Sequence, residues 1–290
     1  MNISNGSAFK NYLSLVKFSH TIFAMPFALI GFFLAYYQKS ENFSWQLLGL
    51  VILSMVFARN AAMSFNRVVD RTIDEKNPRT AQREIPKGII SAKSALMFTI
   101  LNCLLFISTT WFINDLVFYL SPIALAIILL YSYTKRWTYL CHLILGLGLS
   151  LAPIGAFLSV TGKFSLLPIL YSIIVLFWVS GFDIIYALQD EEFDKNESLK
   201  SIPASVGKKH AMHIAALFHF ISAAIVIVVG LYLKATIWYW FGSIIFIALL
   251  VYQHSIISPS DIKRVNIAFA TTNGIASIIY AIFNIVNFLL

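Results

Sequence analysis

The hydrophobic positions of the chain gather in long runs that are separated by short polar segments. Runs of about twenty apolar residues are long enough to cross a membrane as helices. They are predicted at 18–37, 45–65, 94–113, 116–134, 138–160, 165–187, 211–231, 236–254 and 265–289. The pattern therefore predicts an all-α polytopic membrane protein with nine transmembrane helices.

The composition agrees with this fold class. Of 290 residues, 59% are hydrophobic and only 12% are charged, whereas soluble domains carry about 25% charged residues. We expect a single domain over residues 1–290 with no soluble part. The net charge of +8 does not indicate a nucleic-acid partner, because the bases of a membrane protein orient its loops.

The lysines and arginines predict the orientation. With the N-terminus in the cytoplasm, the inner segments and helix ends hold eighteen of the 21 basic residues, and the outer segments hold only Lys39, Lys163 and Lys234. This excess of bases on the inner side follows the usual topology rule. The longest polar connections, about 66–92 and 188–210, then face the cytoplasm.

A motif of one amide and two acids follows the second predicted span. Asn66, Asp70 and Asp74 stand four residues apart, so a helix would place them on one face. Like charges at this spacing repel each other, and a divalent cation would remove the repulsion. Oxygen ligands suit Mg²⁺, which proteins commonly share with substrate phosphates. The bases that follow are of the kind that binds phosphate: Arg79, Arg83 and Lys87.

A second motif repeats the arrangement after the sixth predicted span. Tyr186, Asp190 and Asp194 have the same four-residue spacing, and 120 residues separate Asp70 from Asp190 and Asp74 from Asp194. The equal offset indicates an internal duplication. Facing acid pairs could hold metal ions on either side of one diphosphate.

Together these motifs resemble the UbiA-type intramembrane aromatic prenyltransferases over essentially the whole chain. The resemblance includes N-x-x-x-D-x-x-x-D from Asn66, D-x-x-Y-x-x-x-D-x-x-x-D from Asp183, Arg59 seven residues before Asn66, and YSYTKRWT around Lys135. It implies nine transmembrane helices around a central cavity, with cytoplasmic loops above it and a lateral opening to the lipid bilayer.

The resemblance also implies a Mg²⁺-dependent reaction with a polyprenyl diphosphate. The implied metal ligands are Asp70, Asp74, Asp190 and Asp194, with Asn66 assisting. The implied diphosphate-binding bases are Arg79, Arg83 and Lys135. The departing diphosphate would leave an allylic cation, which an electron-rich aromatic ring attacks. A dry apolar cavity would keep water away from that cation.

For the aromatic acceptor, the resemblance implies a second set of residues. The implied catalytic residues are Asp183, Tyr186 and Asp190. Asp183 would hold or deprotonate the ring hydroxyl, and Tyr186 would support it. Arg59 would face the carboxylate of the acceptor. Family members that act on 4-hydroxybenzoate often have an RLDKP-like stretch in the first span. Here that stretch reads LVKFSHTIFAMPFA, with Lys17 and His20 as candidate acceptor-binding residues.

The first-span stretch resembles the branch that makes menaquinone through futalosine, whose acceptor is a dihydroxynaphthoate. The resemblance therefore favours a hydroxylated aromatic carboxylic acid as the acceptor, either 4-hydroxybenzoate or 1,4-dihydroxy-6-naphthoate. We expect a location in a bacterial inner (cytoplasmic) membrane. Two alternatives stay open: a related enzyme with another acceptor, and a secondary transporter that uses the acids as coupling-ion sites. Transporters usually bury such acids near the bilayer midplane, whereas these acids are predicted at the cytoplasmic rim.

Overall fold

The protein is an all-helical bundle, described by a computed structural model for residues 5–16, 24–39 and 42–290. In these ranges the only extended pairing is an isolated bridge between Ser258 and Asp261. The predicted all-α class is confirmed. In chain order the helices are α1 (Asn5–Leu15), α2 (Met25–Lys39), α3 (Trp45–Val69), α4 (Arg71–Lys76), α5 (Ala92–Trp111), α6 (Asp115–Trp137), α7 (Cys141–Thr161), α8 (Leu166–Ala187), η2 (Leu188–Asp190), α9 (Glu191–Asn196), α10 (Ile202–Tyr232), α11 (Ile237–Ile256), η3 (Ile267–Thr272) and α12 (Asn273–Leu289).

Eight helices of the described part are long and apolar enough to cross a membrane. They correspond to the predicted spans from the second to the ninth. The first predicted span, 18–37, overlaps α2, but residues 17–23 lie outside the described ranges. The count of nine therefore stays a prediction, while the multi-span architecture is established.

Polar residues mark where several spans begin. The side chain of Asn114 accepts a hydrogen bond from Val117 N at 2.9 Å and caps the start of α6. Ser91 caps α5 and Ser201 caps α10 in the same way. Such caps satisfy backbone N–H groups that have no partner within the helix. They separate neighbouring spans even where the polar connection is short.

Small residues let the central helices approach one another closely. A Cβ atom at Gly31 of α2 would lie 2.0 Å from the carbonyl oxygen of Pro153 in α7. A Cβ atom at Gly146 of α7 would lie 2.5 Å from the carbonyl oxygen of Leu176 in α8. Only glycine fits at such contacts, which are typical of helix packing in membranes. The close contacts hold α2, α7 and α8 together in the middle of the bundle.

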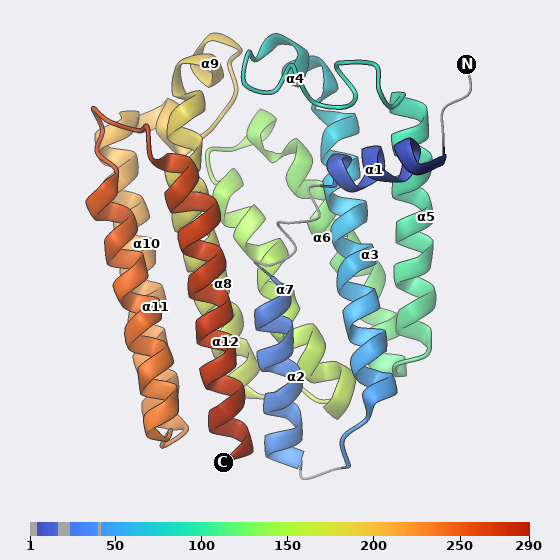
Figure 1. Ribbon diagram of the computed structural model, residues 1–290, viewed down its shortest axis with the longest axis vertical. Helices are drawn as coiled ribbons and strands as arrows, with labels where there is room; N and C mark the ends of the chain where they lie inside the picture. Colours follow the sequence, from blue (N-terminus) through green and yellow to red (C-terminus); the bar gives the residue numbers. More distant parts are fainter. Residues whose placement is uncertain (1–4, 17–23, 40–41) are drawn as a thin grey trace.

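An apolar cavity of about 560 Å³ lies among the spans, as the family resemblance implied. Its walls come mainly from α3, α5, α6, α7 and α8. The short helices α4 and α9 lie at one end of the bundle, and the C-terminus lies at the opposite end (Figure 1). Helix α1 lies across the bundle near the end that carries α4 (Figure 1). The fold thus joins an apolar interior to a polar end.

Candidate active site

Both acid motifs lie where a long helix gives way to a short one. Helix α3 ends at Val69, Asp70 adopts φ −89° and ψ 5°, and α4 begins directly after it. Helix α8 passes through η2 to Asp190, and α9 begins directly after it. The bounds of α4 and α9 differ by the same 120 residues as the acids. The two motifs therefore share a local structure as well as a spacing.

The predicted stacking in the first motif survives the bend at Asp70. The backbone N–H of Asp70 donates to Asn66 O at 2.9 Å, and that of Asp74 donates to Asp70 O at 2.7 Å. In addition, the side-chain amide of Asn66 donates to Asp70 Oδ2 at 2.9 Å. The three side chains thus stay on one side of the chain.

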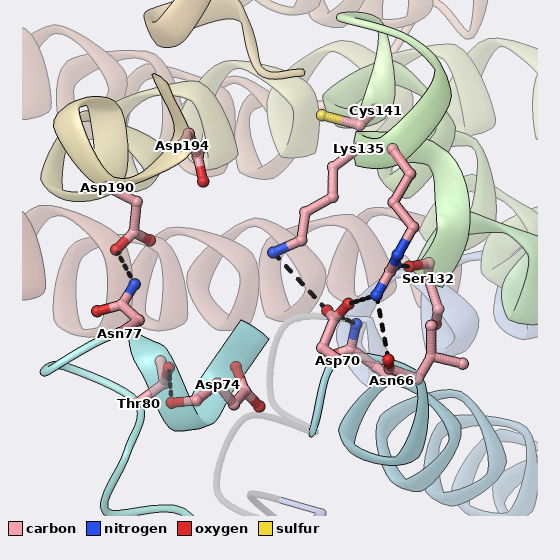
Figure 2. A network of polar contacts seen from close by, with 12 residues as sticks. Asn66, Asp70, Asp74, Asn77, Thr80, Ser132, Lys135, Cys141, Asp190 and Asp194 are labelled. Carbon is pink, nitrogen blue, oxygen red and sulfur yellow. Dashed lines mark hydrogen bonds and ion pairs between the residues drawn. The ribbon is translucent and has the colours of Figure 1, made fainter. Parts of the chain in front are cut away.

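A polar cavity of about 190 Å³ collects most of the residues that the sequence singled out. Figure 2 shows Asp190 and Asp194 projecting toward the segment that carries Asp70 and Asp74. The predicted residues that line this cavity are Asn66, Asp70, Asp74, Arg79, Arg83, Lys135, Asp183, Asp190 and Asp194. Of the remaining predictions, Arg59 and Tyr186 line the larger apolar cavity, while Lys17 and His20 lie outside the described residues.

Two bases of α6 neutralise Asp70. Arg136 Nη2 lies 2.9 Å from Asp70 Oδ1, and Lys135 Nζ lies 3.8 Å from Asp70 Oδ2. Figure 2 shows Lys135 reaching toward Asp70. The sequence pointed to Lys135, but Arg136 makes the shorter contact.

Asp74 has one satisfied and one unsatisfied oxygen. Arg83 Nη1 donates to Asp74 Oδ1 at 2.7 Å. Its other oxygen, Oδ2, is buried and has no hydrogen-bond partner among the described residues. A buried carboxylate oxygen without a partner costs free energy. This oxygen is therefore well suited to bind a cation as one of its ligands.

Asp190 is held from the first half of the chain. Arg79 donates through Nε to Asp190 Oδ1 at 3.0 Å and through Nη2 to Oδ2 at 2.5 Å. The side-chain amide of Asn77 donates to Asp190 Oδ1 at 3.0 Å. Arg79 Nη1 also donates to the hydroxyl of Tyr186 at 3.0 Å. Tyr186 therefore orients the base that neutralises Asp190.

The contacts of Arg79 also affect its protonation. Burial alone would lower the pKa of this guanidinium, but the hydrogen bond and the charge of Asp190 more than offset burial and raise the pKa above its ordinary value. Arg79 is therefore charged throughout the usual pH range. The remaining acid, Asp194, accepts a hydrogen bond from the hydroxyl of Ser201 at 2.8 Å. Among the described residues it has no ion pair like those of the other three acids.

The donor set fits a hard divalent cation such as Mg²⁺. Four carboxylates and the amide of Asn66 offer oxygen ligands from two sides of a small cavity. In the described ranges, no group of three or more His, Cys, Asp and Glu side chains is arranged to hold a metal ion. Mg²⁺ commonly completes its shell with water and substrate phosphates, so an incomplete protein shell with an orphaned oxygen at Asp74 suits it.

The polar and apolar cavities meet. Four residues line both of them: Asn66, Arg83, Tyr131 and Asp183. Asp183 lies in α8, and its Oδ2 is 2.6 Å from Nδ1 of His142 in α7. A molecule with an anionic head and an apolar tail could occupy both spaces at once, with its junction beside Asp183.

Several residues of this site were not expected from the sequence. Arg67 is buried, lines the apolar cavity, and its Nε has no hydrogen-bond partner among the described residues. Arg67 lies two residues beyond the predicted span 45–65, whereas α3 continues to Val69 and buries this arginine, so the sequence carried no signal for it.

His142 lies inside the predicted span 138–160, where an ionisable side chain is itself a signal of function. Its partner Asp183 is distant in sequence and could not be read from the pattern. The same holds for Arg136 and its partner Asp70.

Comparisons with known proteins agree in family and fold. The model of the UbiA prenyltransferase family matches residues 24–278. Over 238 residues, 82% of this chain and 83% of the other, the chain is 28% identical to the 4-hydroxybenzoate octaprenyltransferase of Tolumonas auensis.

Two solved structures have the same architecture. The apo structure of a UbiA homologue from Aeropyrum pernix K1 matches with a TM-score of 0.84 at 29% identity, over 93% of this chain and 98% of that one. A UbiA homologue from Archaeoglobus fulgidus bound to GPP and Mg²⁺ matches with a TM-score of 0.75 at 22% identity, over 97% of this chain and 100% of that one. At 22% identity the second likeness concerns the fold.

Proposed function

Because the chain belongs to the UbiA prenyltransferase family, we propose that it transfers a polyprenyl group from a polyprenyl diphosphate to a hydroxylated aromatic carboxylic acid. The reaction would depend on Mg²⁺ and would serve quinone biosynthesis. The chain would form a single domain over residues 1–290.

The observation that carries this proposal is the junction of the two cavities. A polyprenyl diphosphate has one polar end and one long apolar end. The acid- and base-lined space of about 190 Å³ suits the diphosphate, and the apolar space of about 560 Å³ suits the prenyl tail. The bond that breaks would then lie at the junction, beside Asp183 and Asn66.

The four paired acids would hold the metal at the polar end. Asp70 and Asp74 would bind from one side and Asp190 and Asp194 from the other, with Asn66 assisting. When bound, Mg²⁺ neutralises negative charge that develops on the departing diphosphate. The orphaned Oδ2 of Asp74 supports this assignment.

The bases would then change partners. Arg79, Arg83 and Lys135 contact carboxylates in this structure. Once a cation neutralises those carboxylates, the same bases are available for the phosphate oxygens. Positioned cations that stabilise developing charge are commonly the largest contribution to catalysis.

The transfer step proceeds at the junction. The bond between the first prenyl carbon and the diphosphate oxygen breaks, and both electrons leave with the diphosphate. Asp183 accepts the proton of the acceptor hydroxyl, which makes the ring a stronger nucleophile. A ring carbon of the acceptor forms the new bond to the prenyl carbon. The proton on that ring carbon passes to the departed diphosphate, which restores aromaticity, and Asp183 returns the hydroxyl proton to the ring oxygen.

The acceptor carboxylate would bind to arginines of α3. Arg59 and Arg67 both line the apolar cavity, and a carboxylate would satisfy the buried Nε of Arg67. The similarity to relatives named 4-hydroxybenzoate octaprenyltransferases supports 4-hydroxybenzoate as the acceptor of this chain. The first-span stretch with Lys17 and His20 favours 1,4-dihydroxy-6-naphthoate.

The distribution of basic residues supports a cytoplasmic position for this end of the bundle, in a bacterial inner membrane. A soluble cation and a diphosphate made in the cytosol could then reach it. The transporter alternative is less well supported, because the acids lie at helix ends with basic partners rather than at a broken helix in the bilayer midplane.

The test is a transfer assay on membranes that contain the protein. Polyprenyl diphosphate and Mg²⁺ are supplied with 4-hydroxybenzoate or 1,4-dihydroxy-6-naphthoate, and prenylated products are measured. Asp190→Asn membranes and wild-type membranes with excess EDTA are the controls. We expect product from one of the two acids, and only with intact Asp190 and free Mg²⁺.

The outcomes are distinct. Product from the benzoate alone assigns a ubiquinone-type reaction, and product from the naphthoate alone assigns a menaquinone-type reaction. Prenylation that persists with EDTA contradicts the metal dependence. Unchanged diphosphate with both acids contradicts the proposed function.

A further inference from the structure

Asp183 differs in its partner from three of the other acids of the two motifs. Asp70, Asp74 and Asp190 each contact an arginine, whereas Asp183 contacts a histidine. Nδ1 of His142 lies 2.6 Å from Asp183 Oδ2, and in the described part of the chain no other side chain is bonded to this carboxylate. Its second oxygen, Oδ1, has no such partner. The side chain keeps 22% of its accessible surface and lines both cavities.

His142 itself has no access to either cavity. Its side chain is buried and is absent from the walls of both spaces. Its Nε2 lies 3.3 Å from the backbone N–H of Ile202, at the start of α10. A backbone N–H can only donate, so Nε2 accepts this bond. The proton of the neutral ring is then on Nδ1, and His142 donates it to Asp183.

The histidine is fixed by three helices. Its own backbone belongs to α7, and its carbonyl accepts a hydrogen bond from Ser180 of α8 at 3.1 Å. Its Nε2 contacts the first residue of α10. Ser201, which precedes that residue, donates to Asp194 Oδ2 at 2.8 Å. A continuous path of hydrogen bonds and one peptide unit therefore connects Asp183 to Asp194.

We propose that His142 is a positioning residue for prenyl transfer, which acts through Asp183. By donating to Oδ2 it fixes the carboxylate, so that Oδ1 remains the accepting oxygen for the acceptor hydroxyl at the junction. His142 keeps its own proton throughout, and the hydroxyl proton passes to Asp183. The inference rests on the proposed function, since it assigns a partner to the residue that binds the acceptor hydroxyl.

Two amide substitutions separate the two bonds of the ring. An asparagine amide occupies nearly the same place as Nδ1, and a glutamine amide occupies nearly the same place as Nε2. His142→Asn should keep the hydrogen bond to Asp183. His142→Gln should keep the hydrogen bond from Ile202 and lose the hydrogen bond to Asp183. His254→Asn is the matched control, because His254 belongs to another histidine pair, with His219 at 2.9 Å.

The measurements are kcat and KM for donor and acceptor, with thermal unfolding to verify folding. We expect His142→Gln to lower kcat by roughly 10- to 100-fold, because a hydrogen bond to a charged group is lost. The donor KM and the Mg²⁺ dependence should stay unchanged. His142→Asn should retain activity within roughly fivefold of wild type, and His254→Asn should equal wild type.

A double variant tests whether His142 acts through Asp183. If it does, Asp183→Asn combined with His142→Gln should be no slower than Asp183→Asn alone, because residues that act as one unit are not additive. Additive losses, equal losses for the two amides, or a shifted donor KM would overturn the inference. Wild-type protein without transfer to any aromatic acid would overturn the proposed function itself, and the inference with it.

Discussion

Removal of Arg79 should affect metal binding and turnover in opposite directions. In this structure Arg79 contacts both oxygens of Asp190, at 3.0 and 2.5 Å. A cation that binds Asp190 must displace this guanidinium. The side chains keep 31% and 17% of their accessible surface, so solvent screening limits the net strength of the pair to about 1 kcal/mol. Arg79→Ala should therefore bind Mg²⁺ about fivefold more tightly when no donor is present.

Turnover should fall in the same variant. During transfer, the released guanidinium would stabilise the departing diphosphate, and loss of one such donor commonly costs roughly 10²- to 10³-fold in kcat. The effect on metal binding should not vary with pH in the usual range. Burial lowers the pKa of Arg79, but Asp190 raises it by more, to above its ordinary value. The charge that Arg79 brings to the pair is therefore present throughout the usual range and is lost only in strongly alkaline solution.

The assay is thermal unfolding in detergent over a series of Mg²⁺ concentrations without donor, followed by initial rates with donor and acceptor. A protein that binds a ligand only when folded is stabilised according to its affinity. Lys76→Ala is the matched control, because Lys76 also pairs across the halves, with Glu197, but keeps 60% of its accessible surface. It should change neither quantity. If Arg79→Ala needs as much Mg²⁺ as wild type, or more, competition for Asp190 is refuted.

Two further predictions concern residues with one buried polar atom that has no hydrogen-bond partner in the described part of the chain. Asp74→Asn removes the charge of the acid whose Oδ2 is buried and unpaired. We expect kcat to fall by roughly 10²-fold or more and the Mg²⁺ concentration for half-maximal rate to rise. Unchanged Mg²⁺ dependence would remove Asp74 from the metal ligands. Arg67→Met keeps the apolar stem but loses the charge in the apolar cavity. The acceptor KM should therefore rise roughly tenfold or more while the donor KM stays constant. Equal changes in both KM values would assign Arg67 a structural role.

The spans could be predicted from the sequence because their signal is local. About twenty apolar residues in a row need no knowledge of distant partners. The acids could be predicted for a similar reason, since Asp70 and Asp74 repel each other unless something neutralises them. The bend at Asp70 was not predicted, because it depends on how α4 turns away from α3 at the end of the bundle.

Contacts between distant segments could not be read in the same way. His142 looks like an ordinary apolar-span histidine until the fold brings it to Asp183, 41 residues away, and to Ile202, 60 residues away. Arg136 stood beside Lys135 in the sequence, and only the direction of α6 decides which of the two contacts Asp70 more closely. By its position in the sequence, Arg67 is one of the eighteen basic residues expected on the inner side, and only the structure shows that its side chain is buried.

The repeat of the motif extends to the acids but not to the bases. Arg79 and Arg83 both follow the first motif, yet Arg83 pairs with Asp74 and Arg79 crosses to Asp190. The bases that follow the second motif, Lys195 and Lys208, contact Glu191 instead. One loop thus neutralises acids of both motifs and joins the two halves of the site. A cation that neutralises those acids would release Arg79 and Arg83, which follow the first motif. Most of the positive charge available to a diphosphate would therefore come from that side of the cavity.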